Sequence, residues 1–198
     1  ELGTKVNPGD IVKMNGQTIK KETLRYVLLN KPKNLITAFD DARGRKTVMP
    51  LVMQACKERI YPVGKLERDT VGLLLFTNDG DMIKKLTHPK RGFPKLYNVT
   101  LHKRVQVEHM QQILAGMNLK VGFFKAEKLE YVEGDPYRVG LEIHGPQNRI
   151  LRTAFEELGY KVVKLDRTVF GSLTKKDLPR GHWRHLTEQE VGFLRMLK

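Results

Sequence analysis

The sequence predicts a mixed α+β fold built around a largely antiparallel sheet. Segments with strand character and segments with helical spacing are interspersed along the 198 residues. Hairpin signals and irregular loops join them, without the regular strand–helix–strand alternation of a parallel sheet. A hydrophobic content of 40% is enough for a folded core. The length suits one good-sized domain with at most a fragment of another.

The first elements are expected to be strands. Ile11–Met14, followed by Asn15-Gly16 and a return strand at 17–19, has the pattern of a hairpin with a tight turn. Before residue 60 we further expect strands at 25–30 and 34–39, a polar, basic loop at 40–46, and a helix at 48–55.

The segment from Val63 to Gly80 is the most informative one. Its apolar run Leu73–Phe76, closed by Asn78-Asp79-Gly80, predicts a core strand that ends in a turn. The charged residues 65–70 then lie on the loop that enters this strand, and loops held by a rigid sheet often carry catalytic groups. Taken by itself, the segment is better explained as a solvated turn before a core strand.

The remaining elements follow from their periodicity and end signals. The helix at 148–158 has one apolar face and stops at Gly159. Thr187 to Glu190 has the pattern of a capping box that opens the last helix. The other expected elements are helices at 79–86 and 107–114 and strands at 95–101, 128–132, 137–143 and 161–165.

The charge is the strongest bulk signal. The chain carries a net charge of +14, which favours a polyanionic partner, RNA or DNA, although a merely basic protein without such a partner is the plainer alternative. No apolar run approaches membrane-spanning length, and the N-terminus does not resemble a signal peptide. The single Cys56 suits a reducing cytosol and a structural role. We therefore expect a cytoplasmic protein.

Four segments resemble, in order, the pseudouridine synthases that modify ribosomal RNA. Gly64-Lys-Leu-Glu-Arg-Asp-Thr-Val-Gly-Leu-Leu74 closely resembles their signature Gly-Arg-Leu-Asp-x-x-Thr-x-Gly-Leu-Leu. Lys95–Val99 is similar to their Lys-x-Tyr-x-Val strand, Asn148–Arg152 to their Asn-Arg-Gln-Val-Arg helix start, and Leu178–Leu186 to their closing segment. The resemblance implies a bent, mixed, mostly antiparallel sheet with flanking helices and a central RNA-binding cleft. It also implies conversion of a uridine in ribosomal RNA to pseudouridine by a monomer, without cofactor or metal.

The resemblance assigns three catalytic positions. Glu67 stands where the family has its catalytic Asp, Arg152 where its partner arginine lies, and Tyr97 beside the target base. A glutamate is one methylene longer, and a displacement of about 1 Å can cost on the order of 10²-fold in rate. The chain therefore either retains catalysis or is an RNA-binding, ribosome-assembly protein on the same fold. From the residues alone, Tyr97 is almost as well explained as a core tyrosine and Arg152 as a surface charge, and Asp69 is expected to point elsewhere.

Basic residues near these segments are candidate RNA contacts, and the claim depends on the group because a single one is more often a solvated charge. They are Lys31, Lys33, Arg43, Arg45, Lys46, Lys65, Arg68, Lys90, Arg91 and Arg149. The sequence departs from the family pattern at Pro146-Gln147 and at Thr153, where arginines are common. Residues 1–21 resemble the end of a small S4-type RNA-binding domain, which leaves 22–198 as the catalytic domain.

Overall fold

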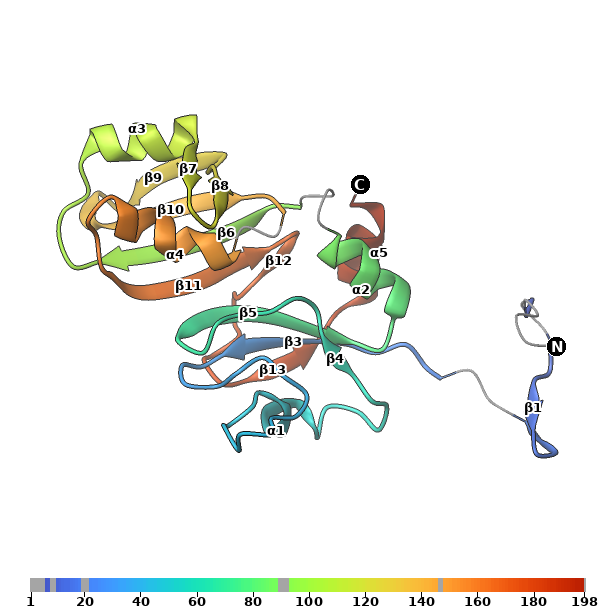
Figure 1. Cartoon of the computed structure of the whole chain (residues 1–198). Helices are drawn as coiled ribbons and strands as arrows, with labels where there is room; N and C mark the ends of the chain where they lie inside the picture. Colours follow the sequence, from blue (N-terminus) through green and yellow to red (C-terminus); the bar gives the residue numbers. More distant parts are fainter. Residues whose placement is uncertain (1–5, 8–9, 19–21, 89–92, 146–147, 198) are drawn as a thin grey trace.

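The computed structural model describes residues 6–7, 10–18, 22–88, 93–145 and 148–197 (Figure 1). For Asn148 and Arg149 only the backbone is described. Within this part of the chain the main sheet has nine strands, and seven of them follow the order β13-β3-β5-β11-β6-β10-β9. These strands are β3 Tyr26–Lys31, β5 Thr70–Thr77, β6 Lys95–Leu101, β9 Lys128–Val132, β10 Asp135–Ile143, β11 Val162–Phe170 and β13 Trp183–His185.

The sheet is mostly antiparallel, as the sequence predicts. Along the seven-strand path, only the central neighbours β5 and β11 run parallel. Their register pairs Arg167 with Gly72, and the register between β11 and β6 pairs Arg167 with Tyr97. Three strands therefore meet at Arg167. Gly72 has φ +107°, and a Cβ there would lie 2.2 Å from the carbonyl oxygen of Arg167, so only glycine permits this close approach.

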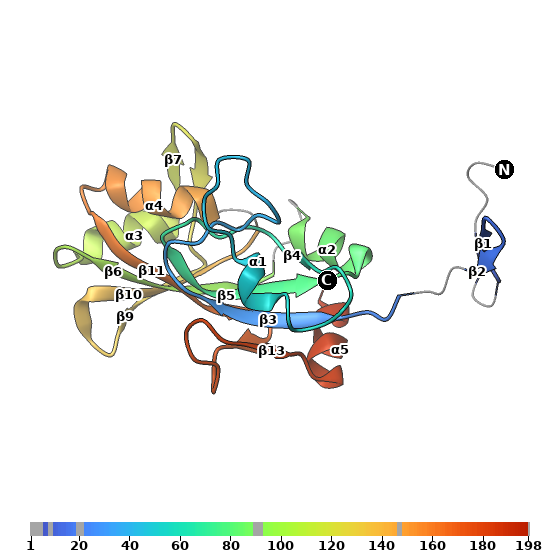
Figure 2. The same cartoon turned by 90° about the horizontal axis from the view of Figure 1, so that it is seen from below.

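Short strands complete the structure. The predicted N-terminal hairpin is confirmed: Asn15 and Gly16 form its turn with positive φ angles, and both views show it apart from the main body (Figures 1 and 2). The short strands are β1 Lys13–Met14, β2 Gln17–Thr18, β4 Tyr61–Pro62, β7 Met117–Leu119, β8 Gly122–Phe124 and β12 Leu173–Thr174.

The helices are α1 Met49–Val52, α2 Gly80–Thr87, α3 Val107–Ala115, α4 Asn148–Glu157 and α5 Glu188–Met196. Asp79 caps α2 by accepting a hydrogen bond from the Met82 backbone amide. The predicted capping box between Thr187 and Glu190 opens α5. In Figure 2, α3, α4 and the β7–β8 hairpin lie on one side of the sheet and α5 lies on the other. Among the described residues, no helix is long and apolar enough to cross a membrane.

The core consists of two clusters that share strand β5. All eight residues of β5 are buried, and its side chains alternate between the two faces. Leu74 and Phe76 pack into the larger cluster with Tyr97 and the apolar face of α4, whereas Leu73 and Leu75 pack into the smaller one with α2 and α5. Each fully buried side chain of this size contributes about 1.5–3 kcal/mol. The strand that follows the charged loop is therefore a rigid support for it.

Four expectations need correction. The predicted strand at 34–39 does not form: Asn34 has φ +68°, the segment contributes only an isolated bridge from Ile36 to Thr47, and Thr37 turns its side chain to the neighbouring loop. The helix predicted at 48–55 is a single turn, α1. The β7–β8 hairpin was not predicted. Strand β11 continues past Leu165 through three polar residues to Phe170 because they bond to side chains and backbone of adjacent elements.

Candidate active site

The loop that carries Glu67 wraps around the side chain of Lys31. The Lys31 ammonium donates hydrogen bonds to the backbone carbonyls of Glu67 (3.1 Å), Arg68 (3.2 Å) and Thr70 (2.8 Å), besides that of Pro32. A lysine has three N–H donors, so these contacts share a single buried charge. Lys31 therefore sets the backbone path on both sides of Glu67.

A second anchor holds the same loop from the opposite side. The Thr37 hydroxyl donates to the Leu66 carbonyl (2.8 Å) and accepts from the Leu66 amide (3.2 Å). The Asn34 amide donates to the Arg68 carbonyl (2.9 Å), and the Thr70 amide closes a turn on the Glu67 carbonyl (3.1 Å). The backbone of Glu67 is thus flanked by fixed neighbours, while its side chain extends outward.

The prediction that Lys31 contacts RNA phosphate is wrong for this structure. Lys31 is 0% exposed, and its ammonium is already surrounded by carbonyl groups. The pKa of Lys31 is lowered to about 8, chiefly by burial; the charge of Asp69 opposes this shift and that of Arg180 adds to it. Its role here is to shape the loop.

Arg152 reaches Glu67 from α4. Its Nε lies 3.4 Å from Oε2 of Glu67, and its second guanidinium nitrogen donates to the Val162 carbonyl of β11 at 3.1 Å. The Arg152 side chain is 25% exposed and that of Glu67 43%. The predicted pair therefore meets in space despite a separation of 85 residues. In the described part of the chain, the carboxylate that pairs with Arg152 is that of Glu67 and not that of Asp69, two residues further on the loop.

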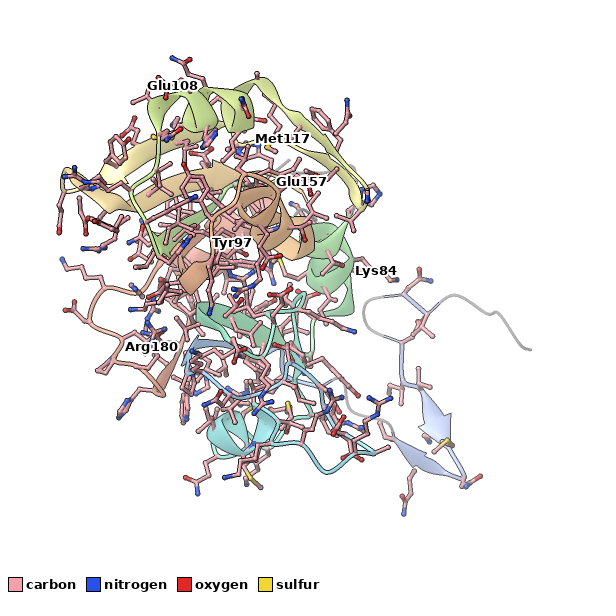
Figure 3. All side chains as sticks on the ribbon, turned by 60° about the vertical axis from the view of Figure 1, so that its left-hand side comes forward. Lys84, Tyr97, Glu108, Met117, Glu157 and Arg180 are labelled. Atoms are coloured by element: carbon pink, nitrogen blue, oxygen red, sulfur yellow. The ribbon has the colours of Figure 1, made fainter. Side chains whose placement is uncertain are left out.

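Tyr97 lies in the middle of the fold (Figure 3). It is 0% exposed, so it is a core residue as well as a candidate site residue. Its hydroxyl accepts a hydrogen bond from Arg167 at 3.5 Å. Burial raises the pKa of Tyr97, the charge of Glu67 raises it too, and Arg167 lowers it. The phenol hydroxyl therefore senses the carboxylate on one side and a guanidinium on the other.

Two buried charged residues of β11 were not among the predicted site residues. Arg167 contacts Tyr97, and Asp166 accepts from Lys175 at 2.9 Å and from Arg180 at 2.7 Å. Burial raises the pKa of Asp166, but the hydrogen bonds and charges of Lys175 and Arg180 outweigh it and hold the pKa below its usual value. Arg180 also bonds to Asn30 and so ties the loop after β12 to β3 (Figure 3). A polar run inside a strand gives no sequence signal that distinguishes such residues from loop charges.

The exposed basic candidates gather beside the Glu67 loop. Arg45, Lys46 and Arg68 line one pocket of about 410 Å³ together with Asn34, Ile36 and Gly44. Asp41 pairs with Arg45 at 2.7 Å and offsets part of this charge. Lys33, Arg43 and Lys65 are exposed as well. The predicted contacts Lys90 and Arg91 fall outside the described residues, and so does the side chain of Arg149.

The arrangement supports chemistry by a carboxylate. A carboxylate that hydrogen-bonds to an arginine is held in one orientation, and it can act as a nucleophile or a general base. A buried phenol next to it can assist proton transfer. In the described part of the chain, no three His, Cys, Asp or Glu side chains are grouped as a metal site would require.

Comparison with known proteins identifies the group to which this fold and site belong. Residues 25–169 match the family model of RNA pseudouridylate synthase. The chain is 37% identical over its whole length to a protein from Bacillus subtilis (strain 168) named ribosomal large subunit pseudouridine synthase B, of which it covers 82%. It is 33% identical to the dual-specificity RNA pseudouridine synthase RluF of Escherichia coli (strain K12), with 96% of this chain and 65% of RluF covered.

Solved structures agree with the sequence match. A crystal structure described as a pseudouridylate synthase superposes with a TM-score of 0.76 at 28% identity, covering 96% of this chain and 83% of that one. An archaeal box H/ACA Nop10–Cbf5 complex, at 17% identity and a TM-score of 0.52, shares the fold. The resemblance read from four sequence segments is therefore confirmed: the chain belongs to the RNA pseudouridylate synthase family.

Proposed function

We propose that this chain converts a uridine of ribosomal RNA to pseudouridine. The observation that carries the proposal is the meeting of Glu67 and Arg152, close enough to Tyr97 for the Glu67 charge to act on its hydroxyl, on a chain that belongs to the family. Relatives named as ribosomal RNA pseudouridine synthases support the substrate class. The target uridine would be held against the loop that Lys31 and Thr37 fix.

The isomerisation makes few chemical demands on the protein. The bond from N1 of uracil to C1′ of the ribose breaks, and a bond from C5 to C1′ forms. The proton on C5 is lost to a base, and N1 gains a proton, so the reaction balances without a cosubstrate. Glu67 would act as nucleophile or base, Arg152 would orient it, and the Tyr97 hydroxyl would assist the proton transfer.

RNA would approach over the exposed basic side chains. Arg45, Lys46 and Arg68 line a pocket next to the candidate site. Arg68 connects the two, because it follows Glu67 in the chain. Phosphate groups of the strand that carries the target uridine would occupy it. We further propose that the chain works as a monomer in the cytoplasm and that residues 1–21 are the end of an S4-type domain.

The alternative function is RNA binding without catalysis. It is motivated by Glu67 itself, whose additional methylene places the carboxylate differently from an aspartate. Both functions predict RNA affinity, so binding alone does not separate them. The test is to incubate the protein with transcripts of small-subunit and large-subunit ribosomal RNA and to map pseudouridine. Our proposal expects one or a few modified uridines; RNA that is bound but unmodified in both transcripts would favour the alternative.

A further inference from the structure

Arg167 is a buried charge whose presence the reaction scheme above leaves unexplained. It is 1% exposed and lies on β11 between the two core clusters. Among the described residues, no Asp or Glu forms an ion pair with it. A buried guanidinium without a carboxylate partner carries a desolvation cost that no ion pair offsets. Stability therefore does not explain why an arginine stands here.

The contacts of Arg167 converge on Tyr97. Its Nε donates to the Leu73 carbonyl of β5 at 2.7 Å, and one terminal nitrogen donates to the Tyr97 hydroxyl at 3.5 Å. The guanidinium carbon lies 4.5 Å from the centre of the Phe170 ring. The other terminal nitrogen is buried and has no hydrogen-bond partner in the described part of the protein. Tyr97 is thus the side chain that Arg167 reaches with a hydrogen bond.

The backbone around Arg167 leaves it little freedom. Gly72 of β5 pairs with Arg167 of β11, and a Cβ on Gly72 would overlap both the Arg167 carbonyl oxygen and its amide nitrogen, at 2.2 and 2.6 Å. The two strands therefore pack as closely as glycine allows. This packing fixes the backbone position from which the Arg167 side chain extends, and the hydrogen bond to the Leu73 carbonyl orients its guanidinium.

We propose that Arg167 is a positioning residue for the isomerisation, which holds the Tyr97 hydroxyl toward the uracil and acts on the reaction through that hydroxyl. The inference rests on the proposed function. The other charged group that acts on this hydroxyl is Glu67, which Arg152 holds. Lys95 acts on the guanidinium instead: burial and the charge of Arg167 lower the pKa of Lys95 to about 8. Arg167 is the one of these whose hydrogen bond fixes the phenol.

A double-mutant cycle tests this role. Single-turnover rates of pseudouridine formation and RNA dissociation constants are measured for the wild type, Arg167→Met, Tyr97→Phe and the double variant. In the protein that keeps Tyr97, Arg167→Met is expected to lower the rate of pseudouridine formation by on the order of 10- to 100-fold. The RNA dissociation constant is expected to stay unchanged within about twofold. In the Tyr97→Phe background, the same change is expected to alter the rate less than about twofold, because the hydroxyl is already absent.

Two further variants separate positioning from folding. Arg167→Lys keeps the charge and one donor, so its rate is expected to fall between those of the wild type and Arg167→Met. Arg184→Met removes a partly buried arginine that pairs with Glu190 away from the site, and it is expected to leave the rate unchanged. Free energies of unfolding for the four members of the cycle measure the contact between Arg167 and Tyr97 without reference to activity. A coupling free energy of zero between them would contradict the proposed contact.

The outcomes distinguish the inference from the function on which it rests. Equal rate losses on removing Arg167 in both backgrounds would make it a structural residue and would overturn the inference while the enzyme remains active. A wild type that forms no pseudouridine would remove the proposed function and the inference together. A rate loss confined to the Tyr97 background, with partial rescue by lysine, supports the positioning role.

Discussion

Arg152 is held by the backbone of β11 independently of Glu67. One guanidinium nitrogen donates to the Val162 carbonyl at 3.1 Å, while Nε lies at the longer distance of 3.4 Å from the Glu67 carboxylate. The pair is partly exposed, and exposed ion pairs contribute about 1 kcal/mol or less to stability. The stability that the ion pair contributes is therefore too small to explain why residue 67 carries a carboxylate. A carboxylate presented to a substrate is a better one.

Replacing Arg152 separates these two explanations. We expect Arg152→Gln to change the free energy of unfolding by about 1 kcal/mol or less, because the pair is solvated. The single-turnover rate is expected to fall by on the order of 10²-fold, because Glu67 loses its orienting charge. Thermal or urea unfolding and a rate measurement on the same preparation check both. A stability loss well above that limit with an unchanged rate would make the pair structural.

Replacing Lys31 tests the anchor of the Glu67 loop. Lys31→Met leaves four carbonyl groups, one of them buried and three partly buried, without their common donor, so we expect a loss of roughly 3 kcal/mol or more in the free energy of unfolding. Lys33→Met, on an exposed neighbour, is the matched control and is expected to change it by less than about 0.5 kcal/mol. Similar unfolding curves for the two variants would contradict the anchoring role.

The buried Lys95 predicts a pH dependence of stability. Burial, with the charge of Arg167, lowers the pKa of Lys95 from 10.5 to about 8. Between these values the unfolded chain binds the proton that the folded chain has released, so wild-type stability rises with pH in that window. Below pH 8 the charged form is penalised by roughly 3 kcal/mol, offset in part by its hydrogen bond to Gly145.

The variant Lys95→Met removes this penalty. We expect it to raise the free energy of unfolding by roughly 2 kcal/mol at pH 7, with a smaller gain at pH 10. Lys31 titrates in the same direction but is present in both proteins, so the difference between them isolates Lys95. Urea unfolding at the two pH values measures it. A gain that is constant or larger at pH 10 would contradict the burial of a charged Lys95.

The basic pocket predicts a salt dependence of RNA binding. Lys46→Gln is expected to lower the slope of log affinity against log salt by about 1, because one phosphate contact is lost. Lys84→Gln removes the same charge from an exposed position on α2, which Figure 3 shows away from Arg180, and it is expected to leave the slope unchanged. Filter binding at salt concentrations from about 50 to about 200 mM measures the slopes of both variants. Equal slopes would place the RNA elsewhere.

Local patterns were sufficient to predict much of the fold. Strand β6 coincides with the predicted 95–101 because its alternation is regular, and α5 begins where the capping box predicted. The pairing of Glu67 with Arg152 came from the family resemblance, because nothing in the local sequence connects residues 85 positions apart. Tyr97 is a core residue, as one of the two interpretations had it, and its place beside the target base stays a prediction.

The features that could not be predicted from local sequence depend on tertiary contacts. Lys31 was read as a surface charge, because a lysine between Asn and Pro gives no sign that a loop will wrap around it. Arg167 and Asp166 lie in a polar run whose burial depends on partners from β5, β6 and the loop after β12. The segment 34–39 has strand-forming composition, yet Thr37 bonds to the Glu67 loop instead of a neighbouring strand.

The most direct test of the account is the single-turnover yield of pseudouridine in ribosomal RNA for the wild type and Glu67→Gln, with Glu67→Asp as the conservative partner. An amide can be neither nucleophile nor base, whereas Gln keeps the length of Glu and RNA affinity should be unchanged. We predict pseudouridine formation by the wild type, equal or faster formation by Glu67→Asp, and none by Glu67→Gln. Equal yields from the wild type and Glu67→Gln would remove Glu67 from the mechanism, and no product from the wild type or Glu67→Asp would establish a binding protein.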